Sequence, residues 1–134
     1  MVFSKKERGG RLSDSPMMAH LLKALQAGVD IGDYGRLAFI IIARYFLPEE
    51  EIVSCLTGQP HLDRERALRL VRRVGREGYH PPTREQILEW QAIQEFEICP
   101  DPEDAESCDI YRQLRFPRQV VSAVNAQRMD PVRN

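Results

Sequence analysis

The sequence has little of what marks several common classes of protein. Its three cysteines are an odd number at wide spacing, so they cannot build a disulfide framework and they fit a reducing compartment. Only ten residues are aromatic, so each is needed to fill a core between short helices. Neither sign of charge dominates, because 19 basic and 20 acidic side chains leave a net charge of −1. This balance argues against a strongly cationic nucleic-acid wrapper and against an acidic disordered chain.

Long hydrophobic runs are also absent. The longest, residues 37–46, already contains Arg44 and is well short of the roughly 20 residues that span a bilayer, so we expect no membrane-spanning segment. No apolar stretch follows Lys5 and Lys6, so we expect no secretory signal and a cytosolic location.

Lysine is scarce, since 16 of the 19 basic residues are arginine. A G+C-rich coding genome produces this skew, and we therefore expect a prokaryotic source. The alternative is selection for the planar, forked guanidinium group, which recognises carboxylates and phosphates better than the ammonium group of lysine does.

What is present predicts an all-α fold. With 134 residues, 43% of them hydrophobic, the chain is long enough for one compact domain and too short for two. We expect six or seven short helices in an irregular bundle. The predicted boundaries are a disordered basic tail over residues 1–13, a helical domain over residues 14–128 and a disordered C-terminus over residues 129–134.

Local signals place the helices. Ser15 followed by Pro16 predicts one helix start, and Thr83 followed by Gln86 fits a capping box at another. Residues 29–33 are interpreted as a connector before a helix over residues 37–46, which is apolar on every side and belongs in the middle of the bundle. Its β-branched run could instead form a buried strand, but no partner strand is visible in the sequence.

A helix over residues 63–76 carries the sharpest functional signal. A step of 100° per residue places five arginines on the arc opposite its apolar residues: Arg66, Arg69, Arg72, Arg73 and Arg76. This set, the Arg face, would suit the phosphates of a nucleic-acid backbone. It would also suit a protein partner. It could instead be an outer helix face that contacts only solvent. A third possibility is that the acidic segment of the chain folds onto it.

That acidic segment is the Pro-containing loop of residues 95–109, which has seven acidic residues and no basic ones. Four of its carboxylates are the predicted binding residues of the loop: Asp101, Glu103, Asp104 and Glu106. A surface with opposed charged patches also permits self-association, so a homodimer is one form that the interaction could take.

Cys99 and Cys108 lie within this loop, and three interpretations of them remain open. They could be two of the ligands of a metal site, although their spacing does not match that of common zinc fingers and further ligands would have to converge. They could form a redox clip that closes the loop. They could also be small hydrophobic residues beneath a loop, which is how free cysteines usually behave. Cys55 is expected in the core, and we predict no resident metal ion.

No catalytic pattern is visible. The sequence has no nucleophile elbow, phosphate-binding loop or dinucleotide-binding turn, and its histidines, His20, His61 and His80, stand in no recognisable pattern with a nucleophile or a carboxylate. We therefore predict a protein that is not an enzyme and has no cofactor. Arg44, within the apolar helix, is expected to be buried against a carboxylate such as Asp30, Asp33 or one from residues 95–109.

A set of aromatic residues near arginines, Trp90, Phe96, Tyr111 and Phe116, could form an interface hot spot or simply fill the core. A pattern of Gly35-Arg36 through Ala43-Arg44, then Glu49-Glu50-Glu51 and Leu56, resembles helical modules at the C-termini of some DNA primases. The shared features are those of helices in general, and no family is assigned from them.

Together these features predict a small cytosolic adaptor or regulatory protein. It would bind a protein partner, or a second copy of itself, through the Arg face and the acidic loop. The alternative is a nucleic-acid-binding accessory module that contacts phosphates through the Arg face of residues 64–76.

Overall fold

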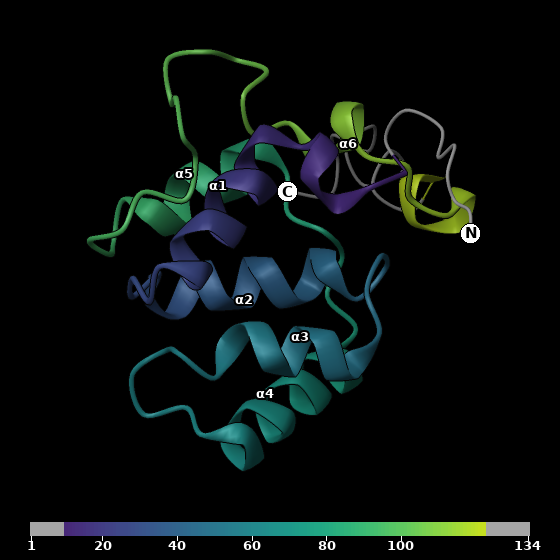
Figure 1. Cartoon of the computed structure of the whole chain (residues 1–134). Coiled ribbons are helices and arrows are strands. Elements are labelled where there is room, and N and C mark those ends of the chain that lie inside the picture. The colour runs from purple at the N-terminus through teal and green to yellow at the C-terminus, as the bar shows by residue number, and fades with distance from the viewer. Residues whose placement is uncertain (1–9, 123–134) are drawn as a thin grey trace.

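The computed structural model describes residues 10–122, and over that range the chain is all-helical with no strand. This confirms the predicted all-α fold of a single compact domain (Figure 1). The elements, in chain order, are a 3-10 turn η1 (Leu12–Asp14), α1 (Pro16–Gln26), α2 (Gly32–Ala43), α3 (Glu49–Leu56), α4 (Arg64–Glu77), α5 (Arg84–Gln91) and α6 (Ile110–Gln113). A further helical turn begins at Arg118 and reaches the edge of the described range.

Helix α2 is the centre of the bundle, and α1, α3, α4 and α5 all pack against it (Figure 1). Its six residues from Ala38 to Ala43 are fully buried, because the helix is apolar on every side. Phe39 is the largest of the fully buried side chains. The β-branched residues Ile40 to Ile42 are helical, so the strand alternative is wrong.

Helix α2 begins at Gly32, five residues before the predicted start at residue 37 and inside the predicted connector. Gly32 has a φ of +80°, which favours glycine, and its N–H donates to the Asp30 carboxylate at 2.9 Å. That hydrogen bond lowers the pKa of Asp30, an effect that outweighs the opposing one of burial and is assisted by Arg36. The turn is therefore set by an Asp side chain and a glycine rather than by an N-terminal cap.

Side chains cap the starts of α1, α4 and α5, and the caps of α1 and α5 are at the predicted residues. Ser15 and Thr83 accept hydrogen bonds from the amides of Met18 and Gln86, both at 3.2 Å. Asp63 does the same for Arg66 at 2.8 Å. The capping box at Thr83 is only half formed, because the Gln86 side chain donates to Glu89 instead of returning the bond.

Two glutamines hold the entrance to α2 from opposite sides of Ile31. Gln59 accepts a hydrogen bond from the Ile31 N–H at 3.1 Å, and Gln94 donates one to the Ile31 carbonyl at 3.0 Å. Gln94 also accepts from the Tyr34 N–H at 2.9 Å. These bonds fix the loops after α3 and α5 to the start of the central helix, because a buried backbone group left without a partner is costly.

The predicted tail and C-terminus lie mostly outside the described residues. Residues 1–9 and 123–134 fall there, whereas residues 10–13 of the predicted tail are described and Leu12 is buried in the core. The helical domain therefore begins at η1. In the described part of the chain, no helix is both long and apolar enough to cross a membrane.

Candidate functional site

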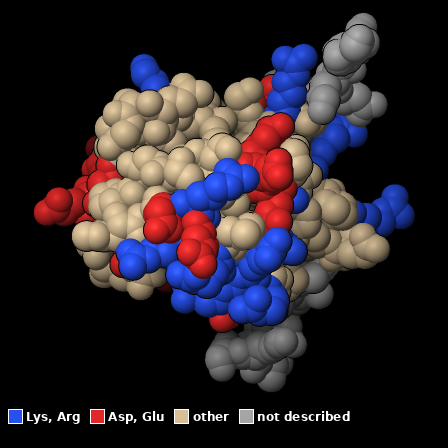
Figure 2. Space-filling model, turned by 60° about the horizontal axis from the view of Figure 1, so that its bottom comes forward, with Lys and Arg blue, Asp and Glu red and all other residues tan. Residues whose placement is uncertain are grey.

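The Arg face forms on the exposed side of α4. The opposite side of the helix buries Ala67, Val71 and Val74 against the bundle, and α3 and α2 are the helices that it contacts. All five arginines of the Arg face are exposed. Figure 2 shows basic side chains gathered in one cluster on this face of the molecule, with acidic side chains directly beside it.

Carboxylates already occupy part of the Arg face. Arg72 donates from Nε and Nη2 to the two oxygens of Glu49, at 3.1 and 3.3 Å, and Arg69 pairs with Glu65 at 3.2 Å. Glu49 is the first residue of α3, so the Arg72 pair joins α3 to α4. The hydrogen bonds to Glu49 and the negative charge of Glu49 raise the pKa of Arg72.

The remaining arginines of the face have no carboxylate partner within residues 10–122. Arg66 donates a long hydrogen bond of 3.4 Å to the carbonyl of His61, and Arg73 and Arg76 form no ion pair there. Arg73 and Arg76 are three residues apart, so they lie on the same side of the helix. They are the part of the Arg face that is available to another molecule.

Arg44 joins this surface, which corrects the prediction that it is buried against a carboxylate. It is exposed at the end of α2, and its guanidinium group lies 5.6 Å from the centre of the Tyr45 ring. Asp30 and Asp33 pair instead with Arg36, at 3.0 and 2.6 Å. The central helix ends at Ala43, so the residue after it reaches the surface even though its neighbours in the sequence are apolar.

A hollow of about 460 Å³ lies between the ends of α2, α3 and α4. Its apolar lining comes from Leu47, Ile52 and Val71, and Gly75 leaves one wall without a side chain. Its charged lining consists of four side chains: Arg44, Arg72, Arg76 and Glu49. The sequence did not predict this hollow, because its walls come from three helices and the connection after α2.

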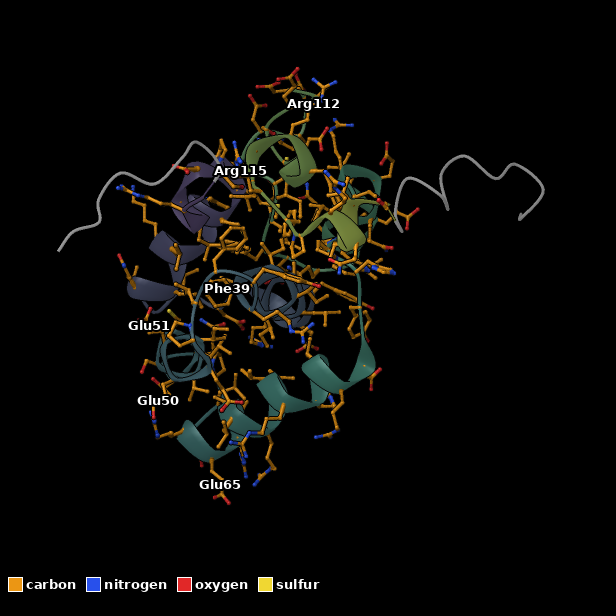
Figure 3. All side chains as sticks on the ribbon, turned by 90° about the vertical axis from the view of Figure 1, so that its right-hand side faces the viewer. Phe39, Glu50, Glu51, Glu65, Arg112 and Arg115 are labelled. Atoms are coloured by element: carbon orange, nitrogen blue, oxygen red, sulfur yellow. The ribbon has the colours of Figure 1, made fainter. Side chains whose placement is uncertain are left out.

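The acidic loop lies at the other end of the molecule from α4. Glu106 pairs with Arg112 at 3.0 Å, and Figure 3 shows Arg112 at the opposite end from Glu65 of α4. The expectation that this loop folds onto the Arg face within one chain is therefore wrong. The loop is fixed instead to α5, because Arg84 donates to the carbonyl of Pro102 at 2.8 Å.

Three of the four predicted loop carboxylates have local partners. Asp101 accepts from the Glu103 N–H at 3.3 Å, Asp104 accepts from the Glu106 N–H at 3.0 Å, and Glu106 is held by Arg112. The bonds that Asp101 and Asp104 accept stabilise turns, as Asp side chains commonly do. All four residues are exposed, and Glu103 is the member of the set whose side chain has no such partner within residues 10–122.

Cys99 and Cys108 are buried free thiols that lie together beneath the acidic loop. The Cys99 sulfur is 3.0 Å from the Ser107 hydroxyl. Burial, and then the neighbouring Cys99, raise the pKa of the Cys108 thiol to about 12. Within residues 10–122, no group of three or more His, Cys, Asp or Glu residues is arranged to hold a metal ion. Cys55 is half-buried rather than deep in the core, and burial together with Glu51 raises its pKa.

The aromatic set is half-buried and packs against the core rather than forming an exposed patch. Phe116 contacts Tyr45, Phe46 and Tyr111 with ring centres 5.4 to 5.7 Å apart, and Trp90 stacks on Tyr34 at 5.6 Å. Phe96 stacks on His20, whose Nε2 is 2.9 Å from the carbonyl of Glu97. The hydrogen-bond partner of the His20 ring is therefore a backbone carbonyl and not a side chain.

Comparison of the chain with protein families, with curated proteins and with solved structures gives no match. The function is therefore argued from the surface itself.

Proposed function

We propose that this chain is a small non-catalytic adaptor that binds a protein partner through the Arg face of α4. The observation that carries the proposal is the mixture of charges on that face. Arg69 and Arg72 are paired with carboxylates, whereas Arg73 and Arg76 beside them are exposed and have no carboxylate partner within residues 10–122. A partner with its own pattern of acidic and apolar groups can match such a surface.

The carboxylates around the Arg face favour a protein over a nucleic acid. Helix α4 carries six arginines, the five of the Arg face and Arg64, and α3 and α4 together carry five glutamates: Glu49, Glu50, Glu51, Glu65 and Glu77. Binding to a nucleic-acid backbone depends on an excess of positive charge along a row of phosphates. Negative side chains about 3 Å from two of the guanidinium groups reduce that excess.

The nucleic-acid module remains the second candidate, because of Arg73 and Arg76. Both are exposed, and Arg44, which also has no carboxylate partner within residues 10–122, adds another guanidinium group beside α4. Tyr79 is exposed just beyond the helix and could stack on a base. Three cations and one ring form a short footprint, so this candidate predicts weak binding that is sensitive to salt.

The proposal includes the cytosol as its compartment and a prokaryotic source. Support for the first is the odd number of cysteines, which suits a reducing environment. Support for the second is the excess of arginine over lysine.

Capture of partners from a nuclease-treated extract tests the proposal. The wild-type chain is compared with Arg73→Glu/Arg76→Glu and with the control Lys23→Glu/Arg118→Glu, which changes the net charge equally at exposed positions elsewhere. We expect at least one protein to be retained by the wild type and by the control and lost from the Arg73/Arg76 variant. Equal recovery on all three would show that the Arg face is not the binding surface. Sedimentation of the purified chain shows in parallel whether a second copy is the partner.

A further inference from the structure

We infer that the hollow between α2, α3 and α4 anchors the partner, and that it takes one large apolar side chain flanked by carboxylates in an acidic peptide segment. This inference rests on the adaptor function proposed above, and it names the chemistry that the surface recognises. The hollow lies beside the Arg face and shares Arg72 and Arg76 with it.

Part of the lining of the hollow is apolar. Ile52 and Val71 belong to the buried core, and Leu47 is half-buried. A hollow of about 460 Å³ is within the range of natural ligand pockets and can receive one leucine-sized or phenylalanine-sized side chain. Apolar anchors of this kind supply much of the affinity of protein interfaces.

The rim of the hollow has a net charge of +2. Arg44, Arg72 and Arg76 contribute three positive charges, and Glu49 contributes one negative charge that is already used on Arg72. The two guanidinium groups without a carboxylate partner within residues 10–122, those of Arg44 and Arg76, come from different helices. A ligand that enters the hollow therefore meets cations from two sides, and carboxylates on either side of its apolar group complement them.

Gly75 keeps this arrangement open. It stands within α4, where glycine is an unfavourable residue, and a Cβ built there would be 3.7 Å from Nη2 of Arg44. The absence of a side chain leaves this wall of the hollow open to the apolar side chain of a ligand. The Tyr45 ring beneath Arg44 holds that guanidinium group in place before the ligand arrives.

Selection from a random 12-residue peptide library displayed on phage tests the inference directly. Peptides are selected on the wild-type chain and then assayed against Gly75→Leu, which fills the hollow with a good helix former, and against Arg44→Gln. The control Gly58→Ala adds a Cβ at a glycine with no neighbouring atom within 4 Å. Circular dichroism confirms that each variant is folded.

We expect the enriched peptides to carry two or more Asp or Glu residues within three positions of a single Leu, Ile, Met, Phe or Trp. Synthetic copies should bind at least tenfold more weakly to Gly75→Leu and several-fold more weakly to Arg44→Gln, with Gly58→Ala unchanged. Replacing the apolar residue by Ser, or the acidic residues by Gln and Asn, should each abolish binding. Failure to enrich acidic and apolar peptides, or equal binding to Gly75→Leu, overturns the inference.

The outcome for the hollow is separable from that for the adaptor function, because Gly75→Leu fills the hollow and leaves both Arg73 and Arg76 in place. If cellular partners are lost from Arg73→Glu/Arg76→Glu but retained by Gly75→Leu, the adaptor function stands and the hollow is not its anchor. If neither variant loses partners, both proposals fail. If selected peptides compete with the captured partner, both are supported together.

Discussion

Arg72 and Glu49 form a two-bond ion pair between α4 and α3, with donor–acceptor distances of 3.1 and 3.3 Å. The pair orients the guanidinium group of Arg72 and places a carboxylate on the face that also carries Arg73 and Arg76, which have no carboxylate partner within residues 10–122. This one contact therefore joins two helices and changes the charge of the surface that they share. It is also the clearest physical difference between this face and a row of cations suited to phosphates.

Removing the carboxylates from the Arg face should make it a better ligand for nucleic acids. We expect Glu49→Gln/Glu65→Gln to bind duplex DNA more tightly at low salt, with a steeper dependence of log affinity on log salt, because two guanidinium groups are released. The control is Glu85→Gln/Glu89→Gln on α5, which changes the net charge equally. If the wild type binds DNA as tightly as the Glu49/Glu65 variant, these ion pairs do not limit nucleic-acid binding.

Gly32→Ala should destabilise the fold, and Gly28→Ala is its matched control. Both glycines have positive φ, +80° and +76°, so each alanine carries backbone strain of about 1–3 kcal/mol. Only at Gly32 would the new Cβ collide with a neighbour, the Gln94 amide carbon at 2.6 Å, and so disturb the bonds that Gln94 makes to Ile31 and Tyr34. Urea unfolding should show the larger loss for Gly32→Ala. Equal losses would mean that Gln94 does not hold the entrance to α2.

Gly75→Ala should stabilise the protein by about 0.5–1 kcal/mol, because glycine within a helix is unfavourable relative to alanine. The added methyl group meets only the Arg44 guanidinium group, at an ordinary contact distance of 3.7 Å. The change in the free energy of unfolding is read from urea titrations. A loss of stability would contradict the arrangement of Arg44 over α4.

The three cysteines should differ in their reaction with iodoacetamide under native conditions. Cys55 is half-buried and should react first, whereas Cys99 and Cys108 are fully buried and should be modified only as the loop opens. Peptide mass spectrometry over time gives the order. Fast modification of Cys108 at neutral pH would contradict its burial, and a Cys99–Cys108 disulfide that forms when the reductant is removed and air supplies the oxidant, and that opens again when reductant is added, would favour the redox clip.

Alkaline pH should lower the free energy of unfolding through the Cys108 thiol. The pKa of Cys108 is about 12 in the folded chain, against an ordinary value of 9.0, so the folded state favours the neutral form. The resulting stability is complete below about pH 9 and is lost as the pH rises toward 12, where the unfolded chain releases the proton first. Cys108→Ser should reduce this loss in urea titrations at pH 8 and pH 10.

Helix starts with a local cap could be predicted from the sequence, and contacts made across the fold could not. Ser15 and Thr83 act within three residues of their own positions, so their pattern is visible in the chain. Gln94 lies more than 60 residues from the backbone carbonyl of Ile31, and nothing near it in the sequence indicates that bond. The start of α2 is not visible in the sequence, because its signal is a hydrogen bond that the N–H of Gly32, a glycine of positive φ, donates to the Asp30 side chain.

The same difference between local and long-range contacts explains why only part of the candidate site could be predicted from the sequence. Helical periodicity alone places the arginines of α4 on one exposed face. Which of them carry a carboxylate depends on where α3 packs, and the exposure of Arg44 depends on where α2 ends. The hollow beside Gly75 follows from both, so it could be found only in the structure.

Fluorescence anisotropy of labelled single- and double-stranded DNA and RNA, titrated across salt, tests the central claim most directly. The wild type is compared with a variant that has alanine at all five positions of the Arg face: Arg66, Arg69, Arg72, Arg73 and Arg76. A face that recognises protein predicts no micromolar binding near physiological salt, and little difference between the two chains. Micromolar binding by the wild type, with log affinity falling linearly with log salt and lost in the variant, would contradict the adaptor function and establish the nucleic-acid module.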